Sequence, residues 1–108
     1  MAQRTYSPIA LEAARLLGAR IRLARTERRW TINELASRIG VTPPTVRKIE
    51  RGDPSVRLGA AFEAAAVVGV VLFHADPQRR GAEMERVVDR LTLLPERVRR
   101  PREVDDDF

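Results

Sequence analysis

The chain of 108 residues has no cysteine, a single histidine (His74) and no run of about 18 apolar residues. The lack of cysteine excludes disulfides and thiolate metal sites, and one histidine cannot assemble a metal cluster, so we expect no metal and no other cofactor. The missing apolar run argues against a membrane-spanning helix. The first ten residues lack the basic and then apolar order of a signal peptide, so we expect a cytoplasmic protein.

Patterns typical of enzymes are also missing from the sequence. It contains no nucleophile beside a matching base, no glycine-rich loop for phosphate and no carboxylate pair on a regular element. The acidic run at residues 105–107 lies in the terminal tail, where side chains are poorly positioned for catalysis. We therefore expect that the protein is not an enzyme.

Lysine is nearly absent, since 19 of the 20 basic side chains are arginine. Residues 1–75 carry 12 basic and 6 acidic side chains, a net charge of +6, whereas residues 76–108 carry 8 basic and 9 acidic ones, a net charge of −1. Arginine suits bidentate contacts to phosphate and guanine, so the first part is a candidate surface for a polyanion. A G+C-rich coding sequence also explains the arginine excess, so the charge alone gives weak support for nucleic acid.

The apolar spacing predicts helices along most of the chain. Helix-start signals, either a capping residue before proline or a T-x-x-E capping box, occur at residues 7–8, 31–34, 42–43 and 76–77. Ser55 is a further candidate cap, and Gly40 and Gly69 are suited to ending helices. We therefore expect an all-α fold, a five-helix bundle with helices over about residues 8–29, 32–39, 43–50, 56–68 and 77–94. The stretch near residues 70–74 is either a short strand or an apolar plug.

Residues 32–50 have the features of two helices joined by a tight turn. Ala36 is small where the helices meet, and Gly40 tolerates the positive φ that the turn needs. Apolar side chains are spaced to attach the pair to the rest of the bundle, at Leu35, Ile39, Val41, Val46 and Ile49. The outward face carries hydroxyl and basic groups, at Thr42, Thr45, Arg47, Lys48 and Arg51. Such a pair is a helix-turn-helix, whose second helix lies in the DNA major groove.

The helix pair resembles the helix-turn-helix of the phage repressor/Cro-like (XRE) family, and the resemblance extends over about residues 15–72. The resemblance rests on "ARTERRW", "ELA", "GV" and "IERGDPSV", and on every apolar, alanine and glycine position of the pattern. It implies a small helical bundle, a homodimer and a transcriptional regulator of the bacterial cytoplasm or nucleoid. It also implies an ion pair between Arg25, late in the first helix, and Glu50, at the end of the reading helix. Glu50 is then a structural partner and not a DNA contact.

The same resemblance implies a set of DNA-binding residues on the second helix. Carried over by position, the base-reading side chains are Pro43, Pro44, Arg47 and Lys48, flanked by Thr42 and Thr45. Many relatives have Gln or Ser at the two proline positions, and proline cannot donate a hydrogen bond. Arg47 therefore becomes the best candidate for a bidentate guanine contact.

Contacts to the DNA backbone are expected around this helix. Relatives often have a phosphate-binding Gln where this chain has Ile32, and Ile cannot replace it. Asn33 and the first amides of that helix are expected to bind phosphate instead. Arg51 and Arg57 are further expected phosphate contacts.

The flanks carry a narrower resemblance, to HipB-type antitoxins. It rests on "RLGARIRLAR", "RKIERGDPSV" and the end "LPERVRRPREVDDDF". It implies an antitoxin that represses its own operon and binds a HipA-type kinase toxin. The alternative function is a protein-binding adaptor that uses the helical bundle without specific DNA binding.

Dimerisation is expected from geometry, because two heads related by a two-fold axis read a palindromic operator on double-stranded DNA. Apolar residues beyond the need of one small core indicate an interface at Val71, Phe73, Val87, Leu91 and Leu94, although packing within one chain is the alternative. The expected organisation is a disordered N-terminus (1–6), a helix-turn-helix domain (7–75), a C-terminal dimerisation helix (76–94) and a flexible charged tail (95–108).

Overall fold

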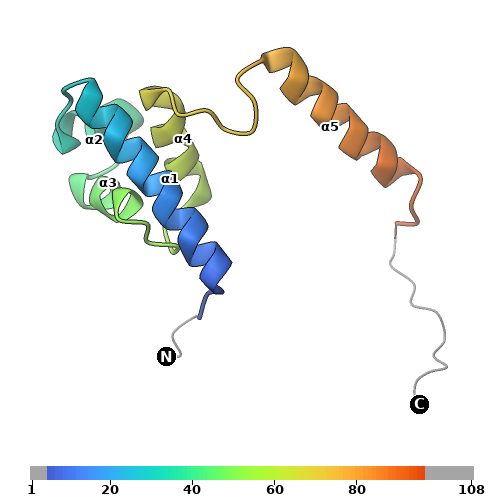
Figure 1. Ribbon diagram of the computed structural model, residues 1–108, viewed down its shortest axis with the longest axis horizontal. Coiled ribbons are helices and arrows are strands. Elements are labelled where there is room, and N and C mark those ends of the chain that lie inside the picture. Colours follow the sequence, from blue (N-terminus) through green and yellow to red (C-terminus); the bar gives the residue numbers. More distant parts are fainter. Residues whose placement is uncertain (1–4, 97–108) are drawn as a thin grey trace. The chain divides into compact units, whose positions relative to one another are not determined.

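The computed structural model describes residues 5–96, and the chain divides after Phe73 into two units, which we describe separately. The first unit holds α1 (Pro8–Glu27), α2 (Ile32–Ile39), α3 (Pro43–Glu50) and α4 (Leu58–Val68), and the second holds α5 (Pro77–Thr92) (Figure 1). No strand occurs in residues 5–96, so the predicted all-α fold with five helices is confirmed. The expected disordered N-terminus and charged tail fall mostly on residues 1–4 and 97–108, which lie outside the described residues.

Side-chain caps begin α1, α2 and α5 as the sequence indicates. The Ser7 hydroxyl and the Asp76 carboxylate each accept a hydrogen bond from a backbone N–H of the first helical turn. The capping box before α2 is complete. Thr31 Oγ1 accepts from the Glu34 amide at 3.0 Å, and Glu34 Oε1 accepts from the Thr31 amide at 2.7 Å. These bonds satisfy amides that a helix start otherwise leaves without partners.

The end of α1 comes earlier than predicted. The helix stops at Glu27 and not at Arg29, because Arg29 has a left-handed backbone with φ of 61°. The Trp30 amide then donates to the Arg25 carbonyl at 3.1 Å, which closes the turn toward α2. Trp30 is half-buried against the core, and the Arg38 guanidinium lies 4.0 Å from the centre of its ring.

The predicted start of α4 is wrong. Ser55 does not cap this helix, because its amide and its hydroxyl both donate to Asp53 Oδ1, at 2.9 and 2.6 Å. The helix begins at Leu58, with Arg57 as its N-cap residue and no side-chain cap. Leu58 lies in the first turn of this helix and is 67% exposed.

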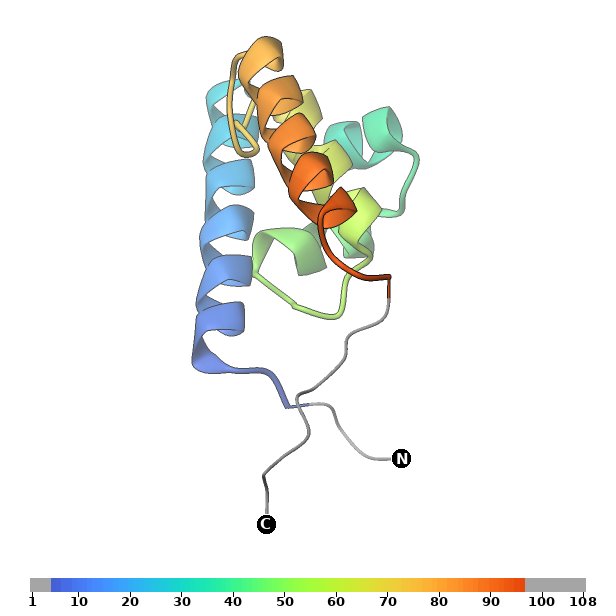
Figure 2. The same ribbon diagram turned by 90° about the vertical axis from the view of Figure 1, so that its right-hand side faces the viewer.

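The core of the first unit is small and apolar. α1 contacts α3 and α4, and α2 contacts α3 and α4 (Figure 2). Between these helices lie the buried side chains of Ile21, Leu35, Ala36, Val46, Ile49, Ala61, Ala64, Ala65 and Val68. Ile39 and Val41 pack against this cluster while remaining half-buried, so the apolar positions of the helix pair face inward as their spacing predicts.

The short strand considered near residues 70–74 is absent, and the apolar plug is what the structure has. Val70 and Leu72 pack against the core, whereas Val71 and Phe73 are 54% and 84% exposed. Phe73 has φ of 69°, outside the extended region that a strand requires. A strand also needs a neighbouring strand for its hydrogen bonds, and residues 5–96 contain none.

Candidate nucleic-acid interface

The turn between α2 and α3 is built as a tight helix-turn-helix. Gly40 ends α2 in the left-handed region with φ of 74°, and the Val41 amide donates to the Ala36 carbonyl at 3.0 Å. Ala36 is 2% exposed, so no larger side chain fits at the contact between the helices without moving them apart. α3 then begins at Pro43, only three residues after Gly40.

The start of α3 differs from the predicted cap. Thr42 has the extended backbone of an N-cap residue, but its side chain makes no capping hydrogen bond. The reason is that Pro43 and Pro44 have no N–H, and the Thr45 amide already donates to the Thr42 carbonyl at 3.0 Å. The hydroxyls of Thr42 and Thr45 instead form a hydrogen bond of 3.1 Å with each other.

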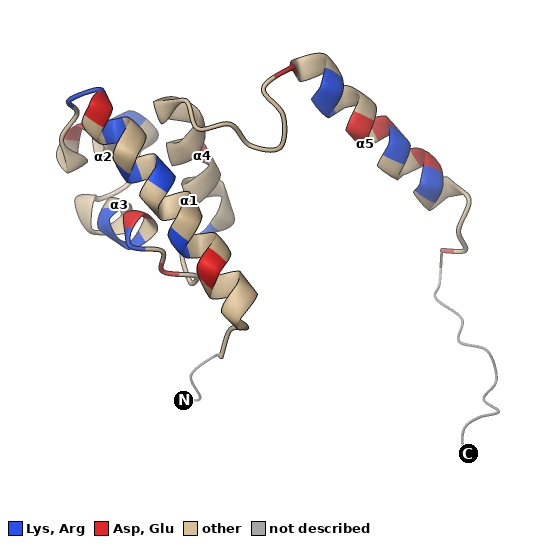
Figure 3. Ribbon diagram, viewed as in Figure 1, with Lys and Arg blue, Asp and Glu red and all other residues tan. Residues whose placement is uncertain are grey.

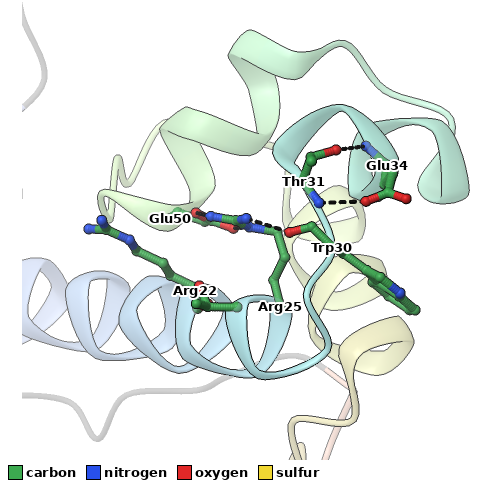
Figure 4. A network of polar contacts seen from close by, with 7 residues as sticks. Arg22, Arg25, Trp30, Thr31, Glu34 and Glu50 are labelled. Atoms are coloured by element: carbon green, nitrogen blue, oxygen red, sulfur yellow. Dashed lines mark hydrogen bonds and ion pairs between the residues drawn. The ribbon is translucent and has the colours of Figure 1, made fainter.

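The end of α3 is attached to α1 by the ion pair that the family resemblance implies (Figure 4). Arg25 Nε donates to Glu50 Oε2 at 2.6 Å and Arg25 Nη2 donates to Glu50 Oε1 at 3.0 Å, so the contact is bidentate. Arg25 Nη1 also donates to the Trp30 carbonyl at 2.7 Å. The two side chains are 12% and 6% exposed. The hydrogen bond to Glu50 raises the pKa of Arg25, so Arg25 stays charged. Glu50 is occupied within the fold by these contacts.

The outward face of α3 presents basic and hydroxyl groups to solvent. Arg47 and Lys48 are exposed one turn into the helix, and Pro44 is exposed at its start, while Pro43 and Thr45 are half-buried. Figure 3 shows basic positions on α1 and on α3 in this unit. The exposed face of α3 is therefore positively charged, with neutral prolines at its beginning.

A hollow lies on each side of α3. The first has a volume of about 380 Å³ and is lined by hydroxyl and basic side chains that include Thr42, Thr45, Lys48, Ser55 and Arg57. Its polar groups, two cations and three hydroxyls, are the types that bind phosphate oxygens. The structure thus brings together four of the residues predicted to bind DNA, namely Thr42, Thr45, Lys48 and Arg57.

The second hollow, of about 280 Å³, contains a residue that sequence reasoning missed. Its lining includes Arg47 and Arg51, which were predicted, and Arg22 of α1, which was not. Arg22 extends from α1 toward the end of α3 where Glu50 lies (Figure 4). The signal in the sequence is its position three residues before Arg25, on the same helical face, but its role depends on how α1 crosses α3.

Asn33 lies apart from both hollows. Its side chain is exposed in the first turn of α2, and it belongs to the lining of neither hollow. The amides of Ile32 and Asn33 have no hydrogen-bond partner among the described residues. The first amides of a helix have no preceding helical carbonyl, and the capping box binds only the amides of Thr31 and Glu34. A helix start with free amides favours a phosphate oxygen.

An acidic residue follows α3 in the loop to α4. Hydrogen bonds from the hydroxyl and then the amide of Ser55 lower the pKa of the Asp53 carboxyl, and the charges of Arg51 and Lys48 lower it further. Asp53 therefore remains a carboxylate that orders the loop. No group of His, Cys, Asp or Glu within residues 5–96 could hold a metal ion.

The five residues predicted for dimerisation are all exposed. Val71 and Phe73 end the first unit, 54% and 84% exposed, and Val87 and Leu91 lie on α5, 46% and 60% exposed. Leu94, which follows α5, is 61% exposed. Within residues 5–96, no helix combines the length and the apolarity needed to cross a membrane.

Comparisons with known proteins agree with this geometry. Residues 21–71 match the family model described as Helix-turn-helix. A solved complex of a serine-to-alanine variant of HipB with an O2 20mer is similar to this chain, with a TM-score of 0.51 and 25% sequence identity. The match covers 71% of this chain and 99% of the HipB chain. No curated protein matches the chain.

Proposed function

We propose that this chain, whose residues 21–71 match the helix-turn-helix family model, is a DNA-binding transcription regulator that acts as a sequence-specific repressor. In this proposal a homodimer binds a palindromic operator and blocks transcription from the promoter that contains it. The observation that carries the proposal is the exposed basic face of α3, bordered on each side by a hollow lined with basic side chains. A recognition helix in the major groove has a phosphate strand on each side.

The proposal divides the contacts into two kinds. Arg22 and Arg51 on one side of α3, and Arg57 on the other, bind phosphates and supply affinity that does not depend on sequence. Arg47 and Lys48 reach the base edges from the exposed face of α3. Arg47 is assigned a bidentate guanine contact, which contributes about 1–3 kcal/mol of discrimination between bases.

The prolines limit what the start of α3 can read. Pro43 and Pro44 offer no donor, and the Thr45 amide is engaged by Thr42. Adenine recognition by an amide side chain is therefore unavailable at these positions, although the exposed ring of Pro44 is suited to contact with a thymine methyl group. Base recognition then depends on the middle of α3.

We further propose that this repressor is the antitoxin of a HipA-type kinase toxin and controls its own operon. The proposal is supported by the likeness to HipB, which extends over 99% of the HipB chain. Co-purification with a kinase encoded beside this gene supports the pairing, and the absence of any such neighbouring gene counts against it. A protein-binding adaptor without specific DNA binding is the alternative function.

The test measures binding of the protein to a palindromic fragment of its own promoter by fluorescence anisotropy at several salt concentrations. We expect an affinity that falls steeply with salt, since each neutralised phosphate releases counterions. Arg47→Ala should lower discrimination against unrelated DNA by about 5- to 150-fold, which corresponds to about 1–3 kcal/mol. Arg20→Ala, an exposed arginine of α1 that lines neither hollow, is the matched control. Equal affinity for promoter and random DNA contradicts the repressor and favours the adaptor.

Arg22 has its own expected signature in the same assay. Arg22→Ala should weaken binding to all DNA sequences to a similar extent and reduce the slope of log affinity against log salt by about 1. An unchanged slope, together with an unchanged affinity, would show that Arg22 does not contact phosphate.

A further inference from the structure

α5 carries an apolar face that no other described part of the second unit covers. The helix has no buried residue. Met84, Val87, Val88 and Leu91 recur at the spacing of one helix face and are 65%, 46%, 45% and 60% exposed. A stripe this exposed, on a helix whose other residues are mostly charged, is typical of a surface that pairs with another helix.

The guanidinium of Arg80, in the first turn of α5, lies away from this apolar stripe. Arg80 lies one turn before Met84, on the same face. Its guanidinium donates to the carbonyls of His74 and Ala75, at 2.5 and 3.0 Å, and so lies toward the segment before the helix. The segment from Glu83 to Leu91 therefore presents its apolar face without an interrupting charge.

The two edges of the stripe carry different charges. Glu83 and Arg90 are separated by seven residues, or about two turns, and so lie on the same edge, each directly before an apolar residue of the stripe. The opposite edge holds Glu85 and Thr92, also seven residues apart. Figure 3 shows that acidic and basic positions alternate along α5.

This pattern distinguishes between the two ways of pairing the helix with a second copy. In a parallel pair, the edge with Glu83 and Arg90 meets the opposite edge of the other helix, where Glu85 repels Glu83. In an antiparallel pair, equal edges meet in reversed direction, so Glu83 of each helix lies near Arg90 of the other. Two-fold symmetry makes this contact twice, and the helix dipoles then also oppose each other favourably.

We propose that α5 pairs with α5 of a second copy of this chain in an antiparallel arrangement, with the apolar stripe between them and two contacts between Glu83 and Arg90. The inference rests on the homodimer of the proposed function and specifies its interface. The ion pair between Glu83 and Arg86 within one helix does not oppose it, because both side chains are more than half exposed and such surface pairs are weak.

Cysteine cross-linking in the full chain tests the direction of pairing, since the chain has no cysteine of its own. Met84→Cys and Leu91→Cys variants are treated with a short thiol-reactive cross-linker, each alone and as a mixture. The antiparallel pair brings position 84 of one copy near position 91 of the other, so the mixture should cross-link far more than either variant alone. Efficient cross-linking of Met84→Cys with itself indicates a parallel pair and overturns the proposal.

Charge reversal supplies a second measurement that does not depend on cysteine. Glu83→Arg or Arg90→Glu alone should weaken the dimer about tenfold in analytical ultracentrifugation, since each places like charges together. A mixture of the two variants restores both opposite-charge contacts and should dimerise like the native chain. Glu85→Arg, on the opposite edge, is the matched control and should change the dimer little.

The outcomes separate this interface from the DNA-binding function. Cross-linking and ultracentrifugation are performed without DNA. If the chain pairs as described but binds no operator, the proposed interface stands and the proposed repressor function is contradicted. A particle with the monomer mass of 12.2 kDa at micromolar concentration overturns the interface. In that case the apolar stripe of α5 is covered by its own chain or by another protein. Failure of the charge-reversed mixture to recover overturns the antiparallel arrangement.

Discussion

A methyl group added at Gly18 tests how closely α1 and α3 pack. Gly18 is buried in the middle of α1. A Cβ at this position would lie 2.3 Å from the Ile49 carbonyl oxygen and 2.7 Å from the Glu50 carbonyl oxygen. Both obstacles are backbone atoms of α3, so they cannot move aside as the end of a flexible side chain does. Gly18→Ala therefore forces the two helices apart.

The magnitude follows from the missing distance. Ordinary van der Waals contact needs 3.4–4 Å, so the helices must separate locally by about 1 Å. Overpacking of this kind typically costs about 1–3 kcal/mol. Alanine also has a higher helix propensity than glycine, by up to about 1 kcal/mol in a helix interior. We expect a net loss of about 1–2 kcal/mol in the free energy of unfolding of the Gly18→Ala protein.

Urea denaturation followed by Trp30 fluorescence measures this loss, because Trp30 is the only tryptophan and lies half-buried against the core. Gly59→Ala in the first turn of α4 is the matched control, since no atom lies within 4 Å of its added Cβ. It should leave stability unchanged or raise it. If Gly18→Ala proves as stable as Gly59→Ala, the close approach of α1 and α3 is refuted.

Two further substitutions test the ion pair and the loop after α3. Glu50→Gln leaves Arg25 without its charged partner and should lower the free energy of unfolding by about 2–3 kcal/mol in the same urea assay. The control Glu63→Gln, on the exposed side of α4, should not lower it. Equal losses in the two variants would contradict the stabilising role of the ion pair. Asp53→Asn tests a pH dependence. Because the folded state lowers the pKa of Asp53, its carboxylate stabilises the fold above the ordinary value of 3.8, and this contribution is lost as pH falls through the folded pKa. The stability difference between the native protein and Asp53→Asn should therefore shrink below that pH, and a constant difference in titrated urea midpoints would exclude the effect.

Local signals explain why the helix pair was predictable from the sequence. Three local signals set the bounds of α2 and the start of α3, and each acts within a few residues. They are the capping box of Thr31 and Glu34, the left-handed Gly40 and the proline at position 43. The all-α class followed from the same kind of signal. The positions expected to read DNA came from the family resemblance, and their contacts with DNA are predictions.

Competition between neighbouring groups explains what the sequence could not predict. Ser55 has the chemistry of a helix cap, but its amide and hydroxyl donate to the carboxylate of Asp53 instead. Phe73 belongs to a residue type that favours strands, but its left-handed backbone and the lack of a neighbouring strand within residues 5–96 exclude one. Arg22 has a role only once α1 crosses α3, and that crossing depends on contacts between residues far apart in the chain.

The two prolines at the start of α3 also bear on how this helix forms. α3 has only 8 residues, and isolated helices shorter than about 12–15 residues are marginal in water because the first turn is costly to nucleate. Pro43 and Pro44 hold φ near its helical value even in the unfolded chain. Because the ring of Pro44 disfavours the helical ψ of Pro43, only Pro44 reduces the conformational entropy lost when the first turn forms, by about 0.4–1 kcal/mol. A proline that offers no hydrogen-bond donor to a ligand thus also preorganises the backbone at the start of α3.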